Sequence, residues 1–106
     1  PVYATKKLSA RTGTRLKDYS AIEINEAFAA QVLACTHELE LDPARINRHG
    51  GAIAVGHPIG MSGARLAVHL VQQLAGDAAS TGTRRALATL CIGGGMGIAA
   101  EFARVD

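Results

Sequence analysis

Glycine is unevenly distributed along this chain, and its distribution limits where helices and strands can form. Eight of the twelve glycines lie in two short segments, residues 50–60 and 93–97. Glycine weakens helices and strands and favours turns, so regular elements must lie between these segments. The 106 residues are enough for one hydrophobic core. The sequence therefore predicts a single domain whose short elements are joined by glycine-rich loops.

The first half of the chain alternates between helical and strand periodicity. The pattern predicts a short helix over residues 2–12, stopped by Gly13, and a strand over residues 19–24. A second helix is expected directly after that strand. Its apolar stripe consists of Phe28, Val32, Cys35 and Leu39. Asp42 and Pro43 end this helix, because proline cannot continue the hydrogen-bond ladder.

The second half predicts a further extended segment, a helix and a hairpin. Residues 52–55 form an apolar run between two glycine-rich turns and are expected to be a buried extended segment. Ser62 is a candidate N-cap and Gly76 a candidate C-terminal residue of the next helix. The buried stripe of this helix is expected to be Leu66, Leu70, Val71 and Leu74.

The C-terminal third predicts two antiparallel strands after a polar loop over residues 77–85. The strands cover residues 86–92 and 96–103, and the glycines at 93–95 form the turn between them. Helices and strands thus alternate along the chain. The expected fold class is α/β, with layers of helix, sheet and helix, ending in an antiparallel hairpin.

Composition excludes several classes of partner. Eleven Lys and Arg against nine Asp and Glu give a net charge of +2, and aromatic residues make up only 4%. Neither a basic surface nor a stacking platform for nucleic acid is expected, and no apolar stretch is long enough to span a membrane. The four histidines do not form a cluster of metal ligands with Cys or carboxylate residues. We therefore expect no nucleic acid, no membrane and no metal among the partners.

Asn25 stands at the expected junction between the first strand and the helix after it. One interpretation is structural: Asn25 caps the helix, and Glu26 in the first turn complements the helix dipole. The other is functional: the amide holds a water or donates to an oxyanion at the end of the strand. Ligands of open α/β sheets tend to bind at such strand ends.

His57 lies between Gly56 and Pro58 in the first glycine-rich segment. Proline restricts the backbone and glycine allows close approach, so the imidazole is expected to point in one direction. An imidazole held in this way can take a proton from a thiol and return it. The alternative is an ordinary histidine in a glycine-rich turn.

Cys91 ends a predicted strand and meets three glycines. A thiol at this position can serve as a nucleophile or as an acid and base, and the glycine backbone exposes N–H groups beside it. The alternative is a buried cysteine at the end of a core strand. No helix follows the glycines, so the run is not a dinucleotide-binding fingerprint. Cys35 belongs to an apolar helix stripe and is expected in the core.

Three segments together resemble the C-terminal part of a thiolase: residues 23–30, 50–60 and 91–97. They occur in the order and at about the spacing of that family, and the resemblance covers nearly the whole chain. It implies the layered thiolase fold and acyl transfer between a 3-ketoacyl-CoA and CoA, or the reverse Claisen condensation. Coenzyme A thioesters would be the substrates, with no metal or redox cofactor.

The resemblance also implies a role for each matching residue. Cys91 corresponds to the acid/base cysteine, and His57 to the histidine that activates a nucleophilic cysteine. Asn25 corresponds to the residue that positions a water in the first oxyanion hole. The backbone N–H of Gly93 corresponds to a donor of the second, and Phe28 lines the acyl pocket.

Parts of a complete thiolase are not represented among these residues. The family's nucleophilic cysteine and most of its CoA-binding loop lie elsewhere, and the chain starts at Pro1 rather than Met. We therefore expect residues 1–106 to be the C-terminal portion of the second thiolase domain, in a longer cytoplasmic homo-oligomeric enzyme of fatty acid metabolism. His49 and Met61 replace the family's usual Asn and Ala.

Two other interpretations remain at this point. The chain could be a non-catalytic half-domain that packs against another subunit, since an isolated half-domain exposes strand edges and apolar surface. A decarboxylating ketoacyl synthase of related fold is less consistent with Cys91, because that family uses His or Asn beside its nucleophile.

Overall fold

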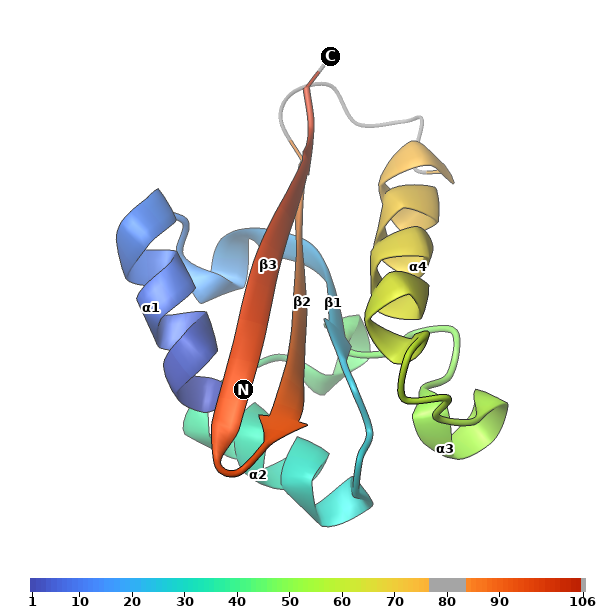
Figure 1. The fold of residues 1–106 in the computed structure, drawn as a ribbon. Coiled ribbons are helices and arrows are strands. Elements are labelled where there is room, and N and C mark those ends of the chain that lie inside the picture. Colours follow the sequence, from blue (N-terminus) through green and yellow to red (C-terminus); the bar gives the residue numbers. More distant parts are fainter. Residues whose placement is uncertain (77–83, 106) are drawn as a thin grey trace.

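The computed structural model describes residues 1–76 and 84–105. Along the described residues, a helix and a strand are followed by three helices and then by two strands (Figure 1). In order they are α1 (Val2–Thr12), a 3₁₀ turn (Leu16–Asp18), β1 (Tyr19–Ile24), α2 (Ala29–Glu38), a second 3₁₀ turn (Pro43–Arg45), α3 (Ala52–Val55), α4 (Ser62–Gly76), β2 (Arg84–Gly93) and β3 (Met96–Arg104).

The strands form one mixed sheet in the order β1-β2-β3. β1 runs parallel to β2, with Ile24 opposite Thr89. β2 and β3 form the antiparallel hairpin, with Cys91 opposite Gly97. The α/β class and the C-terminal hairpin that the sequence predicts are therefore confirmed.

Helices cover both faces of the sheet, α1 and α2 on one side and α4 on the other (Figure 1). On the first side the core comprises Leu8, Tyr19, Ile22, Ile24, Cys35, Leu39, Leu41 and Leu87. On the second side the leucines of α4, each four residues from the next, pack on strand alanines: Leu66, Leu70 and Leu74 on Ala21, Ala86 and Ala88. The small alanines let α4 pack close to the sheet, so the predicted core position of this helix is confirmed.

An irregularity in β1 decides which core Tyr19 joins. The register with β2 shifts between Tyr19 and Ala21, so Ser20 is an extra residue in the strand. A shift of one residue turns the preceding side chain to the opposite face. Tyr19 consequently packs with Ile22 and Ile24 although it is two residues from Ala21, which faces α4.

The outer edge of β1 is covered by a side chain that imitates a strand. The Asn47 amide accepts from the Ile24 N–H at 2.9 Å and donates to the Ile24 carbonyl at 2.9 Å. The Asn47 backbone N–H donates to the Ile22 carbonyl, and Ile46 bridges Ile22 in parallel. Both polar groups of Ile24 on this edge are thereby satisfied without another strand.

The structure corrects three details of the sequence prediction. Residues 52–55 are a short helix rather than a buried strand, and only Ala52 of the four is buried. Periodicity cannot separate these alternatives in so short an apolar run. The helix α2 begins at Ala29 and not directly after β1, so Phe28 is 74% exposed and not part of the stripe. In α4, Val71 is exposed while Leu66, Leu70 and Leu74 are buried.

Other predicted boundaries agree with the structure. α1 ends at Gly13, which adopts a left-handed conformation, and Cys35 is buried in the core. Gly76 is the last described residue of α4, and most of the loop expected over 77–85 lies outside the described residues. Within the described ranges, no helix is both long and apolar enough to cross a membrane.

Candidate functional site

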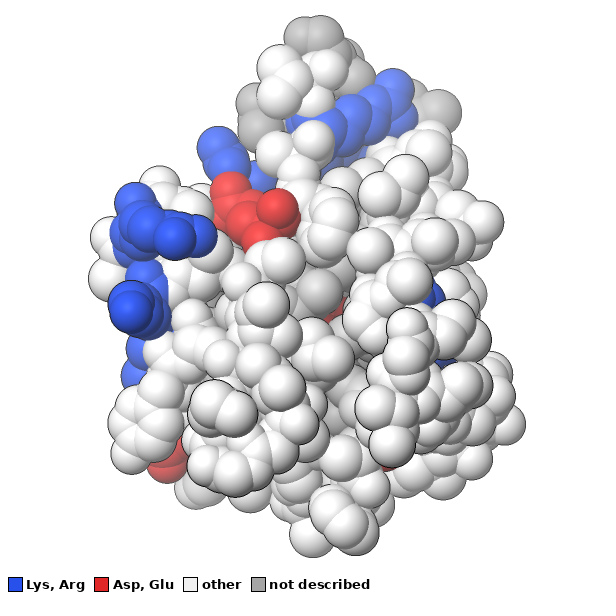
Figure 2. Space-filling model, in the orientation of Figure 1, with Lys and Arg blue, Asp and Glu red and all other residues white. Residues whose placement is uncertain are grey.

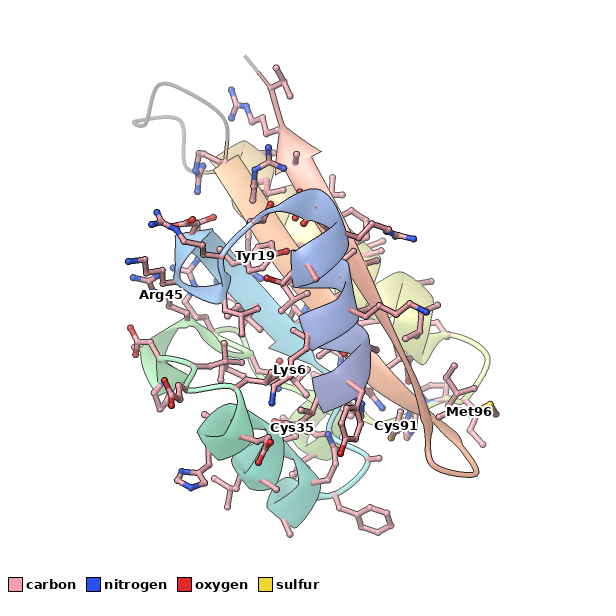
Figure 3. The ribbon with its side chains drawn as sticks, turned by 90° about the vertical axis from the view of Figure 1, so that its left-hand side faces the viewer. Lys6, Tyr19, Cys35, Arg45, Cys91 and Met96 are labelled. Atoms are coloured by element: carbon pink, nitrogen blue, oxygen red, sulfur yellow. The ribbon has the colours of Figure 1, made fainter. Side chains whose placement is uncertain are left out.

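The candidate residues gather at one end of the sheet because β1 and β2 are parallel. Asn25 follows β1, while Cys91 and Gly93 close β2, so these residues share the carboxyl end of both strands. His57 lies in the connection between α3 and α4. Figure 3 shows Cys91 and Met96 at this end and Tyr19 at the other.

Asn25 and His57 are in direct contact. The Asn25 amide nitrogen lies 3.3 Å from His57 Nε2, and Asn25 is fully buried. Its backbone N–H donates to the Thr89 carbonyl at 3.0 Å, which ties the residue to β2. The N-cap interpretation is wrong, because α2 starts four residues later with Phe28 at its N-cap. Among the described residues, the Asn25 side-chain oxygen has no hydrogen-bond partner.

Ser62 fixes the other side of the His57 ring. Ser62 Oγ donates to the Pro58 carbonyl at 3.1 Å, which leaves its lone pairs free to accept. His57 Nδ1 lies 2.5 Å from Ser62 Oγ and is therefore the protonated, donating nitrogen. Nε2 then carries a lone pair that accepts from the Asn25 amide. The network thus selects one tautomer and one orientation of the imidazole.

Cys91 lies at the same end of the sheet as Asn25 and His57 but does not take part in the contact between them. Leu87 belongs to the core on the side of α1 and α2, and strand alternation puts Cys91 on that same side. The thiol is free and half-buried. Within residues 1–76 and 84–105, the structure records no hydrogen bond from Cys91 to Asn25 or His57.

The turn after Cys91 depends on glycine. Gly93, Gly94 and Gly95 have φ values of 124, 57 and 78°, a backbone region that other residues rarely adopt. All three residues are exposed. The turn therefore offers backbone donors at the end of β2.

Phe28 and its neighbours give this end of the sheet an apolar surface. Phe28 projects from the segment between β1 and α2. The other large apolar side chains exposed on the loops and strand ends here are Ile59, Met61, Ile92 and Met96. An aliphatic chain could be accommodated against such side chains.

A buried carboxylate lies two residues before Asn25. Burial raises the pKa of Glu23, and the neighbouring His69 and Arg65 side chains oppose that rise. Both lie 3.8 Å from the carboxylate, and Gln73 donates to it at 3.1 Å. Glu23 thus faces α4 and belongs to the packing of that helix rather than to the Asn25–His57 pair.

Metal ligands do not gather at this site. In the part of the chain that the structure describes, no group of three His, Cys, Asp or Glu side chains is placed to hold a metal ion.

Two residues that shape the site, Ser62 and Glu26, are not predicted in that role from the sequence. The sequence predicts Ser62 only as a helix cap. Its contact with His57, five positions earlier, requires the chain between them to fold back, and periodicity does not reveal this. Glu26 was expected to complement the dipole of the following helix, which is wrong. Its carboxylate instead accepts from Asn47 and from the backbone of Ile53.

Comparison with known proteins gives one consistent family. The family model described as "Thiolase, C-terminal domain" matches residues 1–104. A probable acetyl-CoA acetyltransferase of Escherichia coli (strain K12) is 50% identical over 104 residues, which are 98% of this chain and 25% of that protein. A β-ketoadipyl-CoA thiolase of Pseudomonas putida is 48% identical over 107 residues, or 99% of this chain and 26% of that protein.

Solved structures agree with this assignment. The peroxisomal 3-ketoacyl-CoA thiolase of Saccharomyces cerevisiae, a five-layered protein built from two core domains of identical topology, superposes with a TM-score of 0.87 at 41% identity. The match covers 98% of this chain and 29% of that one. A dimeric peroxisomal thiolase of the same yeast superposes with a TM-score of 0.88 at 40% sequence identity. That match covers 100% of this chain and 25% of the thiolase chain. The chain spans about a quarter of the length of the relatives it matches.

Proposed function

Because this chain belongs to the thiolase family and matches its C-terminal domain, we propose that it provides one part of an acyl-transfer site in a longer protein. The reaction is acyl exchange between a 3-ketoacyl-CoA and CoA, or the reverse condensation. The observation that carries the proposal is the fixed imidazole of His57, held by Ser62 on one nitrogen and by Asn25 on the other.

His57 is the base that activates a nucleophile. With Nδ1–H directed to Ser62, the lone pair of Nε2 can accept the proton of a thiol when that thiol replaces the Asn25 amide as its hydrogen-bond donor. That thiol is supplied from outside this chain, since Cys35 is buried in the core and Cys91 has another role. The thiolate attacks the 3-keto carbon, and the Gly93 N–H donates to the keto oxygen, on which charge develops.

Cys91 is the acid and base of the second half of the reaction. When the bond between C2 and C3 of the substrate breaks, the electron pair remains on C2, and the Cys91 thiol gives its proton there. His57 and a water held by Asn25 donate to the thioester oxygen of this enolate. Free CoA then takes the acyl group from the nucleophilic cysteine. Phe28 contacts the acyl chain.

The remainder of the protein covers the part of this domain's surface that carries few charged side chains. Figure 2 shows charged side chains over α1 and at the upper end of the face, and few over the rest of β3 and α4. Exposed apolar residues on these elements are Val68, Val71, Met96 and Ile98. Surfaces of this kind mark sites of association. The rest of the longer chain and a second copy are the proposed partners.

The same surface supports the alternative function, a non-catalytic half-domain that acts only by association. The two functions differ in what they require of His57 and Cys91. An interaction module needs neither side chain, whereas acyl transfer needs both.

The test is CoA-dependent cleavage of a short 3-ketoacyl-CoA by the whole purified protein. His57→Ala and Cys91→Ala should each lower turnover by at least about a hundredfold, the usual size of an acid/base contribution. Val68→Ser, on the outer face of α4, serves as the comparison variant for the association function. Wild-type turnover in either of the first two variants would remove that residue from the mechanism, and turnover in neither wild type nor variants would favour the interaction module.

A further inference from the structure

The carboxylate of Glu26 joins three segments next to the candidate site. Its Oε2 accepts from the Ile53 N–H at 2.8 Å, and its Oε1 accepts from the Asn47 side-chain amide at 3.2 Å. Ile53 lies in the first turn of α3, and Asn47 covers the edge of β1. A half-buried carboxylate at the end of β1 thus holds the segment over residues 47–55 against the sheet.

The backbone at Gly51 packs directly onto this carboxylate. A Cβ atom at position 51 would lie 2.2 to 2.5 Å from the carboxyl carbon and oxygens of Glu26. Real side chains do not approach so closely, and Gly51 is buried, so the loop has little room to move away. Glycine at this position therefore allows the contact with Glu26.

The Glu26 contacts hold both partners of the Asn25–His57 pair. Glu26 follows Asn25 directly, so its fixed side chain restrains the backbone that presents the Asn25 amide. At the other side, α3 leads through Gly56 into His57. We propose that Glu26 is a positioning residue that fixes the distance between Asn25 and His57 by holding α3 and its preceding loop on the end of β1.

This inference rests on the proposed acyl-transfer function, because it assigns a role toward that reaction. A carboxylate is needed at position 26 because two N–H donors converge on it. A glutamine has one oxygen, and its NH₂ group would face either the Ile53 N–H or the Asn47 amide hydrogens. Glu26→Gln therefore keeps the size of the side chain and removes one of the two hydrogen bonds.

The experiment is a double-mutant cycle in the whole protein, with two readouts. The variants are Glu26→Gln, Glu26→Ala, Gly51→Ala and the Glu26→Ala/Gly51→Ala pair, with Glu38→Gln as the matched control on an exposed carboxylate. The first readout is kcat and KM for thiolysis. The second is amide hydrogen exchange of the peptide over residues 51–57 in the resting protein, without substrate.

We expect Glu26→Gln to lower kcat by about tenfold to a hundredfold with KM within about twofold, since small misplacements of a catalytic group have effects of this size. Exchange over 51–57 should rise by at least about tenfold, and not elsewhere in the domain. Gly51→Ala should behave similarly. In the pair, Gly51→Ala should add nothing to Glu26→Ala, because the carboxylate that the new methyl group would strike is gone.

Three results would overturn the inference. They are wild-type kcat in Glu26→Gln, additive effects of the two alanine substitutions, and a uniform rise in exchange over the whole domain, which would indicate general destabilisation. If the wild-type protein shows no thiolysis, the proposed function fails on its own. The exchange readout then decides separately whether Glu26 fixes residues 51–57.

Discussion

The two ends of the sheet differ in how their polar side chains are partnered. At the amino end of β1 and β2, Glu101 accepts from Tyr19 Oη at 2.7 Å and from Arg85, so one carboxylate joins all three strands. At the carboxyl end, the buried oxygen of Asn25 has no partner among the described residues, and the glycine N–H groups are exposed.

The two ends of the sheet are therefore expected to contribute differently, the amino end to stability and the carboxyl end to the reaction. Paired groups lower the free energy of the folded state, whereas groups left without partners are available to a substrate or a water. We therefore expect substitutions at the amino end to change the free energy of unfolding. Substitutions at the carboxyl end should change turnover.

Among the substitutions that test this comparison, the largest effect is expected for Ser62→Ala, at the carboxyl end. Without Ser62 Oγ, the His57 ring loses the acceptor that selects its tautomer, and kcat should fall by about tenfold to a hundredfold. Ser20→Ala is the matched control, because Ser20 Oγ donates to the Arg85 carbonyl at the other end. The measurement is steady-state thiolysis by the whole protein. Equal kcat in the two variants would contradict the tautomer assignment.

At the amino end, Glu101→Gln should affect stability and leave turnover unchanged. A glutamine can still accept from Tyr19 but presents N–H groups to Arg85. Losing a hydrogen bond to a charged group lowers the free energy of unfolding by about 1–3 kcal/mol. Denaturant unfolding measures this change, with Glu38→Gln as the control. A turnover defect without a stability change would place Glu101 in the site and refute the comparison.

The Glu101 contacts also predict a dependence on pH. Burial raises the pKa of Glu101, but hydrogen bonds from Tyr19, Thr14 and Arg85 outweigh burial, so the pKa is lowered from its ordinary value of 4.5. A lowered pKa contributes stability that is present above pH 4.5 and is lost as the pH falls through the folded-state pKa. Wild-type stability should therefore fall below about pH 4.5 more steeply than that of Glu101→Gln. Parallel curves would show that Glu101 is not the titrating group.

The smallest effect is expected for Lys6→Ala, at the surface of α1. Lys6 pairs with Glu38 at 3.2 Å, and both side chains are more than half exposed. Exposed ion pairs contribute about 0–1 kcal/mol and are screened by salt. The change in the free energy of unfolding should vanish at about 1 M salt, where the Debye length is near 3 Å. A larger change that persists in salt would mean that Lys6 packs through its aliphatic stem.

Periodicity predicted the elements with strong local signals. The helix of Leu66, Leu70 and Leu74 repeats every four residues, and the hairpin has three glycines at its turn, so both followed from the sequence. Residues 52–55 did not, because the hydrogen bond from Ile53 to Glu26 comes from a residue far away in the chain. The conformation of so short a segment depends on such tertiary contacts.

The candidate site could be predicted as a set of residues but not as a geometry. The strand ends and glycine-rich loops of the sequence predict Asn25, His57 and Cys91 as candidates. Asn25 contacts His57, whereas Cys91 lies on the other face of the sheet. This arrangement depends on strand alternation and on the path of α3, and no local sequence pattern predicts it.

The Asn47 amide on the outer edge of β1 limits where a further strand can pair with the sheet. The Asn47 side chain satisfies the polar groups of Ile24, but unlike a strand it presents no further backbone donors and acceptors with which another strand could pair. On that side the hydrogen-bond ladder terminates. Among the described residues, β3 pairs only with β2, so its outer edge is where a further strand could be added. The sheet can therefore be extended from one side only, and the register of any such extension is set by β3.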